Sequence, residues 1–462
     1  MKTMILSRSA LLLSAALFST AHAADAPSAE AQARLEQQIL QMQQQLEAMK
    51  GELQQIKAQN AALSQQQQQQ AAQAQVAAAA APAATGGGIS PNLSLWGYGE
   101  VYYMHPTSEG AKTQADLARA VFGIGYRFSD RTVFNSEFEV EHAIASADDA
   151  GEFEVEQFYV DHQLTDWASV KAGLFLMPFG LINEHHEPTN FYGVQRNFVE
   201  TLIIPSTWRE GGVGFHGNTS VGLNWDVGVT TGLNLGGWNP NPEDPLYRTA
   251  FDLEASGAAP LQATHQELQF ARAQNLSQYV SVSYTGVPGL LAGAAVFTGK
   301  AAKPALPVGL PDQRVTLWEG HARWTPGAGD FSAVYAQGRI SHTAAYNLAN
   351  AGGANPMPSK FLGYYLQGAY TVWQQGDYRL SPFIRWEHYD MGASFDGIAQ
   401  GFTPVPVGFA ADGKPWPELH DRVWTFGAHL FVTPHVVLKA DYQHFDVNSD
   451  FTRFDLGLGL SF

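Results

Sequence analysis

The last eleven residues, TRFDLGLGLSF, constrain the fold more than any other segment. Apolar side chains occupy every second position from Phe454 to Phe462, and Asp455, Ser461 and two glycines lie between them. Successive side chains of a strand point to opposite faces, so this segment has one face suited to lipid and one suited to water. Such a strand, ending the chain on an aromatic residue, predicts the closing strand of a membrane β-barrel.

Similar alternating segments recur along the chain. From Ser94 onward we predict an all-β fold, a 16-stranded antiparallel transmembrane β-barrel. The connections alternate between long segments and tight turns such as Ser129-Asp130, as expected when long loops face outside and short turns face the periplasm. The predicted strands cover residues 94–104, 117–128, 131–142, 153–164, 167–175, 210–218, 223–233, 275–285, 290–300, 314–325, 330–341, 360–372, 378–389, 420–432, 435–446 and 452–462.

The composition is consistent with strands in which hydrophobic and polar residues alternate. The chain has 45 Gly, 27 Phe, 17 Tyr and 11 Trp, yet its mean hydropathy is only −0.16. It has no cysteine, which excludes disulfides and thiolate metal sites. The formal net charge of −17 argues against binding to nucleic acid, because neutralising phosphates requires a basic surface. Acidic groups on external loops are instead expected to contact lipopolysaccharide through bridging divalent cations.

The sequence contains none of the catalytic motifs that would indicate an enzyme. We find neither a GxSxG nucleophile elbow nor a phosphate-binding GxxxxGK[ST] loop. The paired carboxylates that occur cannot be distinguished from charged residues of a barrel wall, so they do not indicate a catalytic site. We therefore expect a protein that is not an enzyme and that needs no cofactor.

Residues 1–23 have the features of a secretory signal peptide. Lys2 and Arg8 precede the apolar run Ala10–Phe18, and a small-residue tripeptide ending at Ala23 suggests the cleavage site. The apolar run is too short to span a bilayer, and no second hydrophobic segment of about 18 residues occurs. The mature chain is therefore expected to be exported.

Residues 24–70 are predicted to form a periplasmic coiled coil. Core residues from Leu35 to Leu63 follow one another in alternating steps of four and three, and Asn60 is a polar core residue that specifies register. The alternative is a disordered Gln-rich tail, because a glutamine run follows the seam. Residues 71–93 are predicted to be a linker rich in Ala, Pro and Gly, and residues 94–462 the barrel.

Two neighbouring strands predict a lumen wall of mixed charge. Arg119 and Arg127 share one face of the second strand, opposite a row of apolar residues. Glu137 and Glu139 share one face of the third strand in the same way. Charged side chains on the lipid face would be costly at the bilayer midplane, so these residues are expected to face the lumen.

The fourth strand, FEVEQFYVDHQL, does not keep a single phase of alternation. Its apolar positions shift from one face to the other between Val155 and Phe158. One extra residue in the strand would restore the pattern, so we predict a β-bulge there.

The connection 177–209 is the predicted constriction of the channel. A barrel of sixteen strands leaves an aqueous lumen, so selectivity requires a segment folded inward. The apolar stretch Phe198–Pro205 would pack poorly in solvent. We expect it to lie against the inner wall.

Several of these features resemble the phosphate-selective porin O and P family. They are the segment KAGLFLMPFG from Lys171 to Gly180 with its long following loop, the segment WREGGVGFHG, the barrel length and the terminal Phe462. The resemblance spans roughly residues 94–462 and implies a trimer of barrels that passes small anions past basic lumen residues. Some related trimeric porins also carry an N-terminal periplasmic coiled coil. This chain departs from the family at Leu174 and Leu176, where polar or basic residues are common.

Basic residues near the predicted loop are candidates for an anion path, because arginine and lysine make charge-assisted hydrogen bonds to anions. The alternative for each is an ion pair with a wall carboxylate such as Glu137 or Glu139. The candidates are Arg119, Arg127, Lys171, Arg196 and Arg209.

The loop also contains the motif Glu184-His185-His186-Glu187, whose imidazoles and carboxylates suit zinc and similar ions. Adjacent ligands on one turn seldom converge without help from elsewhere, and the motif lacks the HExxH spacing. We therefore favour a role in tuning the channel entrance over metal binding.

Together these features predict a passive outer-membrane porin of a Gram-negative bacterium that passes small hydrophilic solutes and prefers anions. We expect a homotrimer tied together by the coiled coil. One alternative is a structural tether whose coiled coil contacts peptidoglycan and whose barrel is an anchor. Another is a channel for cations or chelated metals, which the excess of acidic residues favours.

Overall fold

The computed structural model describes residues 91–144, 146, 151–240, 258–301, 311–398 and 418–462. The predicted signal peptide and coiled coil, and nearly all of the predicted linker, lie outside these residues. The barrel belongs to one compact unit, Ile89–Phe462.

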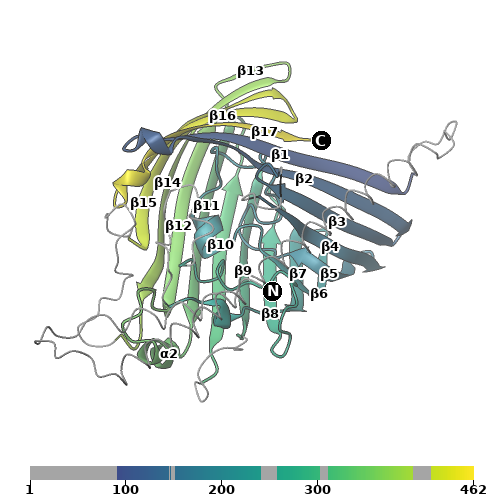
Figure 1. Ribbon diagram of the computed structural model, residues 1–462. Helices are drawn as coiled ribbons and strands as arrows, with labels where there is room; N and C mark the ends of the chain where they lie inside the picture. The colour runs from purple at the N-terminus through teal and green to yellow at the C-terminus, as the bar shows by residue number, and fades with distance from the viewer. Residues whose placement is uncertain (1–90, 145, 147–150, 241–257, 302–310, 399–417) are drawn as a thin grey trace, which may run out of the picture. The chain divides into compact units, whose positions relative to one another are not determined.

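The described residues form a closed antiparallel barrel of sixteen strands, which confirms the predicted fold (Figure 1). The first strand pairs with both the second and the last, so the sheet has no free edge. A short segment, β13, extends the hairpin between β12 and β14. The strands are β1 (Leu93–Pro106), β2 (Gln114–Ser129), β3 (Thr132–Glu141), β4 (Glu152–Thr165), β5 (Ala168–Leu176), β6 (Arg209–Asn218), β7 (Leu223–Thr230), β8 (Ser277–Tyr284), β9 (Leu290–Lys300), β10 (Arg314–Trp324), β11 (Gly329–Ile340), β12 (Lys360–Tyr370), β13 (Trp373–Gln375), β14 (Tyr378–Ser394), β15 (His420–Thr433), β16 (Val436–Phe445) and β17 (Arg453–Ser461).

The connections alternate between short and long, as the sequence predicted. Short connections join β2 to β3, β4 to β5 and β15 to β16, and the connections at the other end of the barrel contain the helical segments. No helix among the described residues is long and apolar enough to cross a bilayer. The helical segments are η1 (Gly110–Lys112), η2 (Val199–Ile203), η3 (Leu235–Gly237), α2 (Thr343–Ala349) and η4 (Ser449–Phe451).

The last strand has the two faces that its sequence predicted. Phe454 and Leu458 are exposed on the outer face, whereas Arg453 and Asp455 are fully buried on the inner face. The inner pair is joined by an ion pair of 2.7 Å between Arg453 Nε and Asp455 Oδ2. Alternation at the sequence level therefore separates a lipid face from a polar wall.

The predicted bulge is present in β4. The register between β3 and β4 shifts between Glu137 and Phe138, which pair with Gln157 and Val155. Glu156 is the extra residue. The side chains of Glu156 and Gln157 both make contacts on the inner side of the barrel, so the bulge adds one more carboxylate to the lumen wall.

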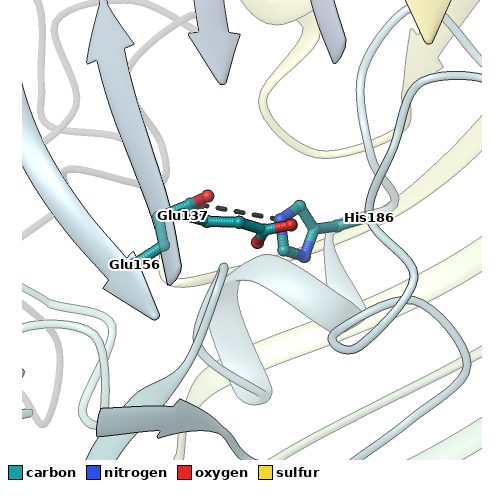
Figure 2. A group of neighbouring side chains, drawn as sticks. All are labelled: Glu137, Glu156 and His186. Carbon is teal, nitrogen blue, oxygen red and sulfur yellow. Dashed lines mark ion pairs between the residues drawn. The ribbon is translucent and has the colours of Figure 1, made fainter. Parts of the chain in front are cut away.

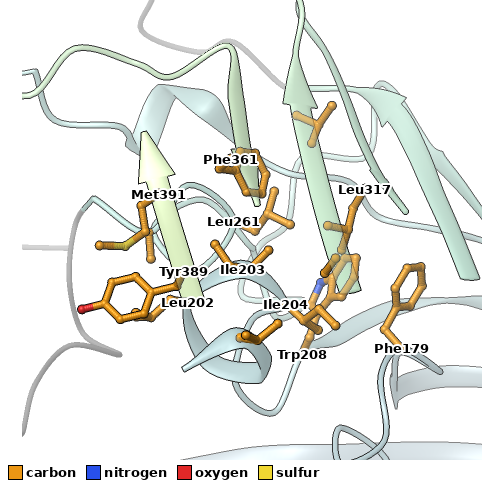
Figure 3. Close-up of a cluster of buried hydrophobic side chains, with 14 of the residues drawn as sticks. Phe179, Leu202, Ile203, Ile204, Trp208, Leu261, Leu317, Phe361, Tyr389 and Met391 are labelled. Carbon is orange, nitrogen blue, oxygen red and sulfur yellow. The ribbon is translucent and has the colours of Figure 1, made fainter. Parts of the chain in front are cut away.

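Part of the barrel interior is an apolar core (Figure 3). Inward-facing residues of β9, β10 and β12, such as Phe297, Leu317 and Phe361, are completely buried in it. The loop between β5 and β6 supplies the opposing side chains, including Leu202 and Trp208. The lumen wall is therefore charged in one sector and apolar in another.

Candidate channel constriction

The connection between β5 and β6, residues 177–208, folds into the barrel and is named the inner loop below. Its helical segment η2 packs against β11, β12 and β14. All five residues of η2 are buried. The expected position of this connection against the inner wall is therefore observed, and it packs against strands far from β5.

Wall carboxylates hold the backbone of the inner loop. Val194 N donates to Asp441 Oδ2 of β16 at 2.6 Å, and Phe198 N donates to Glu387 Oε2 of β14 at 2.7 Å. Hydrogen bonds between an amide and a charged acceptor are among the stronger ones in proteins. They fix the loop at two points on the far side of the barrel.

Glu200 joins the two ends of the inner loop to the wall. Its buried carboxylate accepts hydrogen bonds from Leu181 N at 2.5 Å, from Ile182 N at 3.0 Å and from the Tyr365 hydroxyl at 2.9 Å. Gly180 adopts a φ of 69°, and a Cβ at this position would clash with Glu200 Oε1. A side chain at residue 180 would therefore disturb this junction.

Aromatic contacts complete the docking of the inner loop (Figure 3). The Trp208 ring lies 4.9 Å from the Phe297 ring on β9 and 5.0 Å from Phe179. Phe198 lies 5.5 Å from Tyr389 on β14. Large buried aromatic surfaces of this kind contribute much of the energy of packing, so the loop is a fixed part of the barrel.

Three of the five candidate basic residues are neutralised by carboxylates. Arg119 Nε lies 2.7 Å from Glu100 Oε1, and both side chains are buried. Lys171 Nζ lies 2.6 Å from Asp226 Oδ2. Both residues therefore form ion pairs with wall carboxylates, which was the alternative to an anion path. The partners are Glu100 and Asp226, not Glu137 and Glu139.

Arg209 is the third neutralised residue. It forms ion pairs with Glu154 of β4 and, at 3.0 Å, with Glu267 Oε1. The ladder between β4 and β5 ends at Phe158 and Leu174, so this ion pair connects segments that the sheet no longer joins.

Arg196 and Arg127 differ from these three. Arg196 is half-buried on the inner loop, donates to Thr207 Oγ1 at 2.9 Å and makes no ion pair with any carboxylate of the described residues. Arg127 is exposed close to the short turn after β2. Neither guanidinium group forms an ion pair with a carboxylate of the described residues.

The wall carboxylates Glu137 and Glu139 are both buried. Glu137 accepts hydrogen bonds from Trp96 Nε1 at 2.6 Å and from Gln157 Nε2 at 2.5 Å. Glu139 Oε1 accepts no hydrogen bond from a described donor, and its carboxylate lies against that of Glu156. Both residues lie where the sequence placed them, on the inner face of β3.

The sequence analysis missed three further pairs of charged residues in the lumen. Each consists of a base and an acid two positions apart on one strand, and every member is buried. Such spacing places both side chains on one face, so strict alternation within these strands is the signal that would have found them. The pairs are Arg385 with Glu387, Lys439 with Asp441 and Arg453 with Asp455.

The motif of residues 184–187 does not form a single site. Glu184 and His185 are exposed, and Glu187 accepts a hydrogen bond from Asn190 Nδ2 at 2.6 Å. His186 alone turns inward and is buried. Figure 2 shows it beside Glu137 and Glu156, which come from two strands of the wall.

The imidazole of His186 is held in one orientation. Its Nδ1 lies 2.8 Å from the carbonyl oxygen of Asn183, and its Nε2 lies 2.5 Å from the Tyr98 hydroxyl. Burial, together with the charges of Arg119 and Arg196, lowers the pKa of His186 to about 4. The imidazole is therefore neutral at neutral pH.

Comparisons with known proteins agree with this architecture. An uncharacterized protein of Aquifex aeolicus is 28% identical over 368 residues, which are 78% of this chain and 77% of that protein. The structure of Salmonella typhi OmpF in complex with daunomycin is similar with a TM-score of 0.50 at 14% identity, over 80% of this chain and 98% of that one. An anion-selective porin from Comamonas acidovorans gives a TM-score of 0.46 at 11% identity, over 80% of this chain and 99% of that one. Residues 95–449 match the family described as phosphate-selective porin O and P. The chain therefore belongs to the phosphate-selective porin O and P family of outer-membrane channels.

Proposed function

We propose that the protein is a passive porin through which small hydrophilic solutes diffuse, with a preference for anions such as phosphate or small organic anions. The inner loop sets the size limit. The observation that carries the proposal is the position of Arg196, a basic residue on the segment that narrows the lumen and without an ion pair to a described carboxylate.

The distribution of charge supports an anion preference over a cation preference. Glu137 and Glu139 are buried and therefore have little contact with the lumen water. Arg196 and Arg127 are more accessible than these carboxylates. A guanidinium group attracts anions and binds carboxylate or phosphate with two parallel hydrogen bonds. Glu184 and His185, both exposed on the inner loop, would tune the entrance to this path.

A second candidate function is a channel for cations or chelated metals. The lumen wall contains more carboxylates near β3 and β4 than basic residues to neutralise them, because Arg119 is already paired with Glu100. If the negative electrostatic field of these carboxylates extends into the lumen water, it would attract cations. The two functions predict opposite signs of ion selectivity.

We further propose that three copies assemble into a homotrimer, with the coiled coil of residues 24–70 in the periplasm. Family membership and the heptad seam support this arrangement. Lipopolysaccharide would contact the outer loops, and the coiled coil would reach peptidoglycan or another periplasmic partner.

Recording from the purified full chain in a planar lipid bilayer tests the channel function. In potassium chloride we expect discrete conductance steps, and added phosphate should reduce the chloride current in a saturable way, because both anions would meet the same arginine. Chloride current that phosphate leaves unchanged would contradict a shared anion site. Absence of any conductance would favour a barrel that anchors the coiled coil.

A further inference from the structure

We infer that Glu137, Glu156 and His186 form a binding site for one divalent first-row metal ion, of which Zn²⁺ is the natural probe, and that this ion clamps the inner loop to β3 and β4 (Figure 2). The inference is independent of the sign of ion selectivity. It assigns a structural role to the one histidine of residues 184–187 that turns inward.

The geometry brings three ligand atoms together from three segments of the chain. One oxygen of Glu137, one oxygen of Glu156 and one ring nitrogen of His186 all lie within 4.8 Å of one another. Glu137 is on β3, Glu156 is the bulged residue of β4 and His186 is on the inner loop. Figure 2 shows the three side chains converging on one point. Two carboxylates and one imidazole are a suitable ligand set for Zn²⁺ and similar ions.

An unsatisfied atom points into this cluster. Glu156 is completely buried, and its Oε1 accepts no hydrogen bond from a described donor, although its carboxylate can share a proton with that of Glu139. This oxygen lies 3.6 Å from His186 Nε2. A buried carboxylate oxygen without a donor is costly, and a metal ion would satisfy it.

The other two ligands remain capable of binding a metal. Glu137 accepts one hydrogen bond on each oxygen, from Trp96 and Gln157, and a carboxylate oxygen has a second lone pair. The Nδ1 of His186 faces a carbonyl oxygen, which fixes the tautomer with the Nε2 lone pair directed into the cluster.

The Tyr98 hydroxyl occupies part of the same space. It lies 2.5 Å from His186 Nε2 and 3.2 Å from Glu156 Oε2. Its hydrogen bond uses the lone pair that a metal requires, so metal binding must replace it. The phenol would then be next to the ion as a further oxygen ligand.

The local charge also requires compensation. Glu137, Glu139 and Glu156 are buried near one another, and two of the arginines whose charges reach Glu139, Arg119 and Arg209, are already paired with other carboxylates. Several carboxylates buried side by side repel one another, and a divalent cation would neutralise two of them. The imidazole ligand favours Zn²⁺ over Mg²⁺ and Ca²⁺, which prefer oxygen.

Isothermal titration of Zn²⁺ into the untagged, detergent-solubilised full chain tests the site. We expect one saturable site per chain, and each of Glu156→Gln and His186→Gln should weaken its affinity at least tenfold. His435→Gln changes an exposed histidine in the short turn after β15 and should leave the affinity within about twofold. Mg²⁺ should bind at least tenfold more weakly than Zn²⁺.

Glu156→Gln preserves the shape of the side chain, so it carries the test if His186→Gln fails to fold, as judged by circular dichroism. No saturable Zn²⁺ binding, or binding that Glu156→Gln leaves unchanged, would overturn the inference. Equal affinity for Mg²⁺ and Zn²⁺ would also overturn it, because it would indicate an acidic surface without an imidazole ligand.

Discussion

At the scale of single residues, the partners of a charged side chain decide what it does in this lumen. Arg119 and Glu100 are direct neighbours in the ladder of β1 and β2, and their ion pair is buried. Arg196 has a hydroxyl partner instead of a carboxylate. A paired arginine contributes structure, whereas an unpaired one contributes to the field that solutes meet.

Replacing Arg196 with glutamine tests this distinction. We expect Arg196→Gln to lower the ratio of anion to cation permeability about fivefold, the equivalent of about 1 kcal/mol lost from a charge-assisted contact. The reversal potential in a salt gradient measures the ratio.

The matched control for this variant is Arg422→Gln. Arg422 is on the outer face of β15, the face shared with the exposed Trp424 and Phe426. Its loss should not change the selectivity. An equal effect of both variants would mean that net charge, and not the position of Arg196, sets the preference.

The sequence predicts which face of its strand many a wall residue occupies, but it does not predict the partner of each charged side chain. Alternation correctly placed Arg119, Glu137 and Glu139 on the inner face. The partner of Arg119 is Glu100, and this pairing depends on the register of β1 against β2, which no local pattern contains. The convergence of His186 with Glu156 was missed because it requires the fold of the inner loop.

At the scale of elements, the inner loop is the feature that distinguishes this barrel from an open cylinder. The apolar stretch from Phe198 predicted that it folds inward, because such a stretch needs a partner. Its sites of attachment, such as the hydrogen bond from Phe198 N to Glu387, could not be predicted because they lie on strands remote in sequence.

Disrupting η2 should open the channel. Leu202 is completely buried in the apolar core, so Leu202→Asp places a charge there and should undock the inner loop. We expect a larger single-channel conductance and a weaker ion selectivity. Single-channel recording in a planar bilayer measures both.

Leu202→Met is the control for this prediction, because a change that conserves volume costs less than about 1.5 kcal/mol. It should retain the conductance and selectivity of the unchanged chain. If Leu202→Asp folds into a barrel with unaltered conductance, the inner loop does not limit the pore.

At the scale of the whole molecule, the closed barrel was the easiest feature to predict. Sixteen alternating segments with connections of alternating length are compatible with few other folds. The apolar sector of the lumen was not predicted, because Leu317 faces inward on the same strand that presents Trp318 outward, and the two residues have similar chemistry. Only the position of the inner loop shows which apolar residues are covered by protein.

The described strands close the barrel by themselves, since β1 pairs directly with β17. Deleting residues 28–70 should therefore leave the single-channel conductance unchanged, while the trimer that we propose dissociates at a lower temperature. Light scattering in detergent at increasing temperature measures the assembly.

A substitution within the seam provides a finer comparison. Leu46→Asp places a charge in the heptad core and should weaken the assembly, whereas Gln44→Asp lies outside the seam and should not. A failure of envelope integrity without loss of conductance would instead indicate that tethering is the main role of the coiled coil.

The reversal potential of the unchanged full chain under a potassium chloride gradient tests the central claim most directly. An anion-preferring pore predicts a reversal potential displaced toward the equilibrium potential of chloride, because Arg196 and Arg127 keep their charge in the lumen. Displacement toward the equilibrium potential of potassium would contradict the account. It would mean that the carboxylates of β3 and β4, and not the two arginines, determine which ions pass.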